Sequence, residues 1–145
     1  MRITEMIPGR MYISGSLNDE GWRFIQQHIN VVINLRTNPD VPSVESQHTT
    51  YYWFPLTIWV TPSLEWTIQF IELIHDLFNK RQRILIHDRF GIQRLGFAIT
   101  AFFMRYFHLR RDEALKMVRQ YKQDIEPTPN YMDLLLEYER YLFGH

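Results

Sequence analysis

The clearest chemical pattern in the chain is a loop at residues 87–96, with the sequence HDRFGIQRLG. It lies between a short apolar run and the start of a long helical pattern. A loop that enters a helix points several backbone N–H groups at one position, and the helix dipole adds partial positive charge there. The loop is therefore suited to binding an anion, and Gly91 permits the tight backbone that such a loop needs.

Arg94 supports the same interpretation. A cation at a helix N-terminus opposes the dipole, at a cost of about 0.3–1 kcal/mol, unless an anion compensates it. A planar guanidinium can hold two oxygens of one phosphate group, which the ammonium group of lysine cannot do. The position of this residue therefore indicates a negatively charged partner, and its side-chain geometry suits a phosphate.

The loop resembles the His-Cys-x-x-x-x-x-Arg signature of protein tyrosine and dual-specificity phosphatases, with Asp88 in the cysteine position. His87, Gly91 and Arg94 match the signature. The flanking segments IPGRMYISG, VVINLR, YYWFPL and DIEPTPNYMDLLLEYE are similar too, so the resemblance covers essentially the whole chain. It implies an α/β fold for residues 1–145: one cysteine-phosphatase-like domain whose central, mostly parallel sheet is flanked by helices.

The resemblance also implies roles for particular residues. In the family, a cysteine thiolate attacks phosphorus, loop amides and an arginine hold the phosphate oxygens, and an aspartic acid protonates the leaving oxygen. Asp88 occupies the nucleophile position, Arg94 the transition-state arginine position and Ile58 the general-acid position. The implied phosphate-binding loop, between a strand and a helix N-terminus, comprises His87, Asp88, Arg89, Phe90, Gly91, Ile92, Gln93 and Arg94. The role implied for His87 is to support this loop.

Two of the three catalytic parts are missing. The chain contains no cysteine, which removes any thiolate nucleophile and also excludes disulfides and zinc–thiolate sites. No carboxylate occurs between Pro55 and Ser63, and Ile58 cannot donate a proton. Loss of general acid catalysis alone typically costs about 10²–10⁴-fold in rate. Leu95 also replaces the hydroxyl residue that the family commonly carries after the arginine.

The carboxylate of Asp88 keeps the negative charge that a thiolate would carry. We therefore expect it to accept the loop amides, to pair with Arg94 and to fill its own anion pocket. A phosphate dianion would then enter beside a fixed negative charge. At about 4 Å the repulsion per charge pair is roughly 1 kcal/mol in water and about 4 kcal/mol at an effective dielectric of 20. We expect phosphate to bind weakly.

Three functions remain open. The first, which we predict, is a pseudophosphatase: a binding or regulatory module whose partner is a weakly bound phosphorylated protein, a small phosphorylated ligand or another protein. The second is a phosphatase silenced by an engineered Cys→Asp change at position 88, against which the missing acid at Ile58 argues. The third is metal-assisted phosphotransfer with Asp88 as nucleophile, although such enzymes generally need further carboxylates nearby. The plainest alternative is that Asp88 only caps a loop of an ordinary α/β domain. We expect no cofactor and no metal.

Helical and strand-like patterns alternate along the chain and define the elements that position the loop. Strands are predicted at 3–6, 11–14, 31–35, 51–56 and 83–87. Helices are predicted after the cap Asn18, from Thr61-Pro62 to Phe78, from Arg94 to Phe107, from Asp112 to Gln123 and from Asn130 to Phe143. The polar stretch 37–50 is predicted to be a surface loop. Trp59 lies in a second loop, expected to face the pocket, where it shields the pocket, joins a partner surface or simply packs.

Bulk properties narrow the class of protein. A chain of 145 residues with 46% hydrophobic and 22% charged residues is typical of one globular domain. Sixteen basic residues balance sixteen acidic ones, so no net field attracts nucleic acid or an anionic membrane. No run of about 18 apolar residues occurs. We expect a cytoplasmic protein that binds neither nucleic acid nor membrane.

Overall fold

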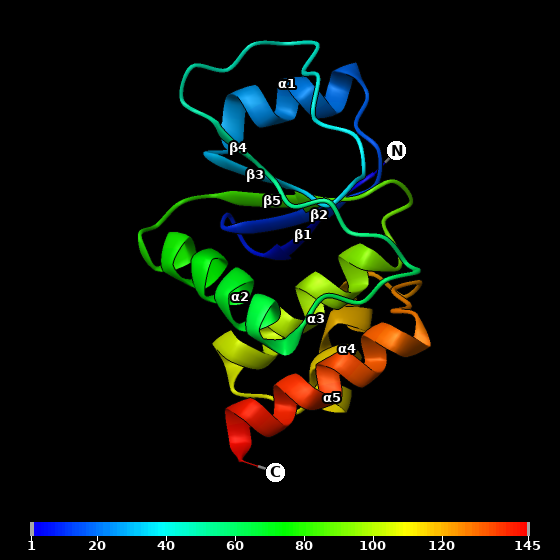
Figure 1. Ribbon diagram of the computed structural model, residues 1–145. Coiled ribbons are helices and arrows are strands. Elements are labelled where there is room, and N and C mark those ends of the chain that lie inside the picture. The colour runs from blue at the N-terminus through cyan, green and yellow to red at the C-terminus, as the bar shows by residue number, and fades with distance from the viewer. Residues whose placement is uncertain (1, 145) are drawn as a thin grey trace.

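The computed structural model describes residues 2–144 and contains a five-stranded sheet and five helices (Figure 1). The strands are β1 (Ile3–Ile7), β2 (Met11–Ser14), β3 (Val31–Asn34), β4 (Thr50–Trp53) and β5 (Ile84–His87). The helices are α1 (Asp19–His28), α2 (Leu64–Asn79), α3 (Arg94–Phe107), α4 (Arg111–Tyr121) and α5 (Pro129–Phe143). The strand order is β1-β2-β5-β3-β4. Only β1 and β2 pair antiparallel, so the predicted mostly parallel α/β fold is confirmed.

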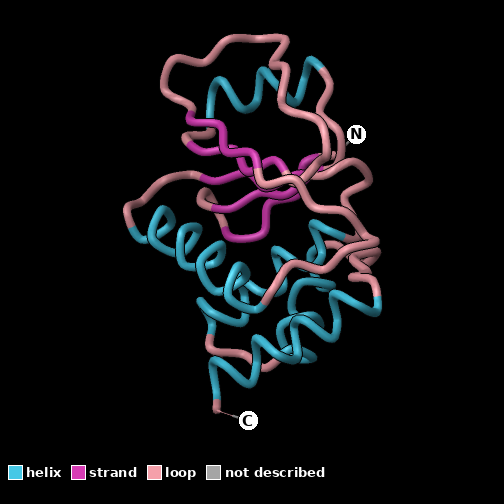
Figure 2. The backbone as a smooth tube through the Cα atoms, in the orientation of Figure 1, coloured by secondary structure: helices cyan, strands magenta, loops and turns pink. Residues whose placement is uncertain are grey.

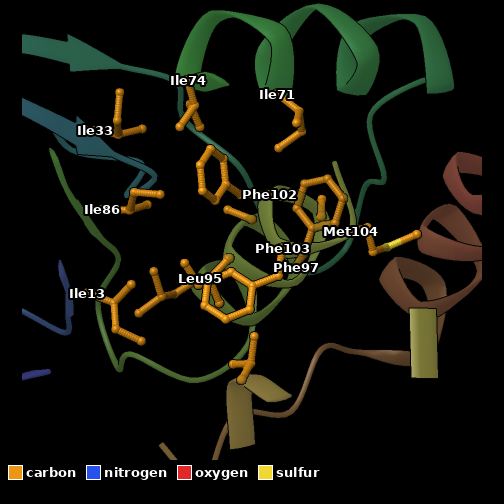
Figure 3. Close-up of a cluster of buried hydrophobic side chains, with 14 of the residues drawn as sticks. Ile13, Ile33, Ile71, Ile74, Ile86, Leu95, Phe97, Phe102, Phe103 and Met104 are labelled. Carbon is orange, nitrogen blue, oxygen red and sulfur yellow. The ribbon is translucent and has the colours of Figure 1, made fainter. Parts of the chain in front are cut away.

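The central strands β3 and β5 are buried on both faces, as expected of parallel strands between two layers of helices. Helix α1 covers one face, and α2 to α5 cover the other (Figure 1). Successive side chains of a strand point to opposite faces. Val32 and Leu85 therefore meet α1, whereas Ile33 and Ile86 face Phe102 of α3 in the main core (Figure 3).

The predicted start of α2 is wrong by two to three residues. The helix begins at Leu64, and Thr61-Pro62 lies outside it. The cap is Ser63, whose Oγ accepts a hydrogen bond from the backbone N of Trp66 at 3.0 Å. The hydroxyl of Ser63, which lies closer to the first apolar residue of the helix, therefore caps it in place of the predicted Thr61. The Asn18 cap of α1 is confirmed, since its Oδ1 accepts from Gly21 N at 2.9 Å.

The loops that follow the parallel strands carry the site. Because β3, β4 and β5 run parallel, their carboxyl ends lie at one edge of the sheet, where ligands of open α/β sheets bind. The predicted loop 37–50 runs beyond α1 (Figure 2). It is tied to that helix region by Gln26 Nε2, which donates to Glu45 O at 3.0 Å, and by Thr49 Oγ1, which donates to Ile29 O at 2.7 Å. Within residues 2–144, no helix is long and apolar enough to cross a membrane.

Candidate functional site

Two glycines let the predicted phosphate-binding loop pack against the turn after β2. Gly91 has a φ of +74°, in the left-handed region that favours glycine. A Cβ atom at Gly91 would lie 3.0 Å from the backbone N of Gly15, and a Cβ at Gly15 would lie 3.1 Å from Arg89 O. Ser16 fixes the same contact, because its backbone N and its Oγ both donate to Arg89 O at 3.0 Å. The loop shape is thus set by backbone contacts.

The segment before α5 holds the other end of the loop. Glu126 N donates to Ile92 O at 3.1 Å. Gly96, in the first turn of α3, makes room for this segment, since a Cβ there would lie 3.1 Å from Ile125 Cγ2 and 3.4 Å from the Pro127 ring. The loop is therefore fixed on both sides.

Asp88 is 2% exposed and points into the loop. Its Oδ1 accepts a hydrogen bond from Gly91 N at 2.5 Å, and its Oδ2 accepts one from Leu95 N at 2.9 Å. One carboxylate oxygen is therefore bound by an amide of the loop and the other by an amide in the first turn of α3, where the helix dipole also favours negative charge. The prediction that Asp88 accepts loop amides is confirmed.

The predicted pair between Asp88 and Arg94 is wrong. Among residues 2–144, no ion pair joins the two side chains. Arg94 Nη1 instead donates to Leu56 O at 3.0 Å and to Leu35 O at 3.4 Å. The physical reason is that the amides at the start of α3 hold Asp88, whereas Arg94 extends toward the ends of β3 and β4. Its Nε and Nη2 atoms bond to no residue in the described part of the chain.

The loop with Ile58 is tied to the start of α5. Tyr131 donates its hydroxyl to Thr57 O at 2.7 Å. Asn130 Nδ2 donates to Ile58 O at 3.2 Å and to Thr61 Oγ1 at 2.8 Å. Burial raises the pKa of Tyr131 to about 12, although the positive charge of Arg94 opposes the shift. Tyr131 therefore stays protonated and remains a donor at neutral pH.

Other residues of the predicted loop point outward. Phe90 is 67% exposed, and the guanidinium carbon of Arg89 lies 5.0 Å from the centroid of its ring. Gln93 precedes the first residue of α3, and its side chain makes no capping hydrogen bond. The structure therefore brings Asp88, Gly91 and Arg94 to the inside of the loop or its rim and leaves Arg89 and Phe90 outside.

His87, the last residue of β5, lies beside a carboxylate that sequence analysis missed. Its Nε2 lies 3.0 Å from Asp40 Oδ1, and the two side chains are 0% and 6% exposed. The contact is at ion-pair distance but lacks hydrogen-bond alignment, so none of these atoms is satisfied within residues 2–144. The buried hydroxyl of Tyr51 lies nearby, and burial together with the negative charge of Asp40 raises its pKa.

Asn130, Tyr131 and Asp40 were not predicted as site residues. Tyr131 falls in the helix predicted from Asn130 to Phe143, and it is fully buried as well as bonded to the loop. The match of the closing segment to the family could have indicated a role for Asn130 and Tyr131. Nothing in the sequence distinguished Asp40 from other polar residues of the 37–50 loop.

Two open grooves lie near the loop. The larger, about 980 Å³, is bounded by β1, by Arg89 and Phe90, and by the end of α4. The smaller, about 520 Å³, is lined mainly by Trp53, Phe54, Leu56, Val60, Pro62 and Trp66, and we call it the β4 groove. Arg94 reaches this groove through its hydrogen bond to Leu56 O.

Comparisons with known proteins agree with this geometry. A family model described as "Dual specificity phosphatase, catalytic domain" matches residues 20–141. The chain is 27% identical over 143 residues to the dual specificity protein phosphatase Mpk3 of Drosophila melanogaster, covering 95% of this chain and 34% of Mpk3. It is 25% identical over 111 residues to human dual specificity protein phosphatase 9, covering 74% of this chain and 29% of that protein. The chain thus spans about a third of the length of these curated relatives.

Solved structures share the fold. Human DUSP28 superposes with a TM-score of 0.83 at 16% identity, covering 97% of this chain and 94% of that chain. The human tyrosine phosphatase-like serine/threonine/tyrosine-interacting protein superposes with a TM-score of 0.80 at 21% identity, covering 96% of each chain.

Proposed function

The chain belongs to the dual specificity phosphatase family, and within that family we propose that it is a pseudophosphatase, a binding or regulatory module without turnover. The observation that carries the proposal is the carboxylate of Asp88, which accepts the amides of Gly91 and Leu95 inside the loop. The site that would hold a phosphoryl group is therefore partly filled by the chain itself.

The missing catalytic groups support the proposal. The chain has no cysteine, so a phosphocysteine intermediate cannot form. Ile58 stands in the loop that would supply the acid, and hydrogen bonds from Asn130 and Tyr131 hold that loop in place. Attack by Asp88 itself on phosphorus is disfavoured, because each of its oxygens accepts a backbone amide, which lowers the nucleophilicity of the carboxylate. For this reason we favour a binding module over metal-assisted phosphotransfer.

The test is an aryl phosphate assay on wild type, Asp88→Cys, and Asp88→Cys combined with Ile58→Asp. We expect no turnover by wild type above buffer, weak turnover by Asp88→Cys, and about 10²–10⁴-fold more by the double variant, because it restores both nucleophile and acid. The matched control combines Asp88→Cys with Val41→Asp. Val41 is 80% exposed, so this variant adds a carboxylate outside the acid loop and should remain as weak as Asp88→Cys alone.

Three results would contradict the proposal. Turnover by wild type would show that the chain is an enzyme, and dependence of that turnover on added metal would identify Asp88 as a nucleophile. Full activity of Asp88→Cys alone would favour a silenced phosphatase that takes its acid from another residue. If the Val41→Asp control, combined with Asp88→Cys, is as active as the Ile58→Asp double variant, Ile58 does not occupy the general-acid position.

A further inference from the structure

We propose that the β4 groove is the partner-binding surface of this module and that its occupant is an extended, acidic, unphosphorylated segment of another protein with a bulky apolar side chain. The inference rests on the proposed function, because an active phosphatase would take a phosphoryl group into the loop. Four features of the groove support it: its apolar surface, its rigidity, a free strand edge and unpaired positive charge.

The rim of the groove exposes large apolar side chains over an aromatic floor. Val60 is 72% exposed, the adjacent Trp59 84% and Trp53 48%. In the floor, the rings of Phe54 and Trp66 meet edge to face with centroids 6.3 Å apart. Tryptophan is enriched among the residues that dominate binding energy at interfaces, and clustered exposed apolar groups mark interaction sites. The surface therefore fits an apolar anchor on the partner.

The groove is held in shape before anything binds. The loop that carries Trp59 and Val60 is bonded to Asn130 and Tyr131 at Thr57, Ile58 and Thr61, as described above. The apolar side chains of this loop are therefore exposed although its backbone is held in place by hydrogen bonds. A preorganised surface loses less conformational entropy on binding, which favours affinity for a short segment.

The groove runs beside an unpaired strand edge. Strand β4 lies at the end of the sheet, and its residues Thr50 and Phe54 donate their N–H groups to Asn30 O and Asn34 O, beside β3. Alternate residues point their N–H and C=O groups to opposite sides, so those of Tyr51 and Trp53 face away from β3. In the described part of the chain, no hydrogen bond outside the β3–β4 ladder uses them. An extended segment can add there as a further strand.

The charges beside the groove select an acidic segment. Trp53 Nε1 donates to Arg36 O at 2.9 Å, which places the backbone of Arg36 beside one lining residue of the groove, and Arg94 bonds to the carbonyl of another, Leu56. Neither guanidinium group forms an ion pair among residues 2–144. No acidic residue occurs between positions 46 and 64, and the next one, Glu65, accepts a hydrogen bond from Gln69. A carboxylate on the partner would supply the missing negative charge.

The fixed carboxylate of Asp88 argues against a phosphorylated partner. Arg94 and the loop amides could hold a phosphate dianion only with this carboxylate beside it. A carboxylate of the partner carries one negative charge instead of two, so at the same distance its repulsion from Asp88 is half that of a phosphate dianion. The observations therefore favour an unphosphorylated acidic segment over a phosphopeptide.

The experiment selects short random peptides on the immobilised protein and measures their affinity by fluorescence anisotropy. We expect enriched peptides to combine carboxylates with a bulky apolar residue. Val60→Asp and Arg36→Glu should each weaken binding by roughly tenfold or more. The matched controls Val41→Asp and Arg23→Glu change an exposed valine and an exposed arginine away from the groove, so they should leave affinity within about twofold. On binding, the amides of Tyr51 and Trp53 should gain protection from hydrogen exchange.

Several outcomes would overturn the inference. It fails if no peptide is enriched over the Val60→Asp background, or if the two amides gain no protection. If phosphorylated peptides bind at least tenfold more tightly than their unphosphorylated forms, the partner binds at the phosphate-binding loop and not at the β4 groove. Self-association that Val60→Asp abolishes, measured by analytical ultracentrifugation, would make a second copy the occupant. In each case the inertness of wild type toward aryl phosphate still tests the proposed function separately.

Discussion

Replacing Asp88 by alanine removes the acceptor of two buried amides and should destabilise the protein. Each buried N–H left without a partner costs about 1–3 kcal/mol, so the loss of Gly91 and Leu95 bonds should lower the unfolding free energy by about 2–6 kcal/mol. For a chain of this size, 1 kcal/mol corresponds to roughly 3–4 °C in Tm. We expect the Tm of Asp88→Ala to fall by about 6–24 °C in a buffer without phosphate or sulfate, with water in the vacated site favouring the lower value.

Phosphate should then rescue the variant but not wild type. The substitution removes a repulsion of about 1–4 kcal/mol per charge pair, so phosphate should bind Asp88→Ala about 5- to 1,000-fold more tightly than wild type. A ligand that binds only the folded state at a hundred times its Kd raises stability by about 2.7 kcal/mol. About half or more of the lost Tm should therefore return as phosphate is added.

The assay is differential scanning calorimetry across a phosphate titration, with sodium chloride keeping the ionic strength constant. Asp88→Ala combined with Arg94→Ala should lose the rescue, because the guanidinium no longer holds the anion. Asp124→Ala is the matched control, since this carboxylate is 59% exposed and pairs with Lys122 at the surface. A phosphate-induced rise in Tm as large in wild type as in the variant would refute the claim that Asp88 fills the anion pocket. A variant as stable as wild type would refute the claim that the two amide bonds stabilise the loop.

Three further predictions concern the surrounding structure. Tyr131→Phe removes the hydrogen bond to Thr57 O and should lower the unfolding free energy in urea by about 1–2 kcal/mol, with faster hydrogen exchange in residues 57–61; unchanged exchange would show that the bond does not anchor the loop. Gly91→Ala places a Cβ 3.0 Å from Gly15 N at a φ of +74° and should cost at least about 1–2 kcal/mol, so a circular dichroism melt equal to that of wild type would contradict the close contact. Burial raises the pKa of Tyr131 to about 12 and also raises that of Tyr138, so above pH 10.0, the ordinary tyrosine value, the folded state binds more protons than the unfolded state. The unfolding free energy, fully retained below that pH, should therefore fall as pH rises toward 12, less steeply in Tyr131→Phe; a flat profile in urea titrations would contradict the burial of these hydroxyls.

Local patterns were enough to predict the elements that position the site. The apolar runs at 31–35 and 83–87 became the buried strands β3 and β5, because a strand covered on both faces is built mainly from apolar residues. The spacing from His87 to Arg94 located the loop, because both ends are set by elements with strong periodicity. Strand β4 ends before the predicted run 51–56 does, since its register with β3 ends at the pair Asn34–Trp53.

Contacts between distant segments could not be predicted in the same way. The direction of Arg94 depends on where Leu35 and Leu56 present their carbonyls, and those positions follow from tertiary packing. Asp40 contacts His87 across 47 positions of sequence because tertiary folding brings the 37–50 loop to the end of β5, and no local pattern encodes that path. The start of α2 was missed for a simpler reason, since two hydroxyl residues near Pro62 could each have capped it.

The short segment 126–131 mechanically couples the two walls of the candidate site. Its first residue bonds to Ile92 of the phosphate-binding loop, and its last two bond to the loop that carries Ile58. A ligand, a modification or a truncation that shifts the start of α5 would therefore displace both walls together without touching either. Variants in α5 should therefore affect binding at the site indirectly. We expect them to act by changing the position of the two loops relative to each other.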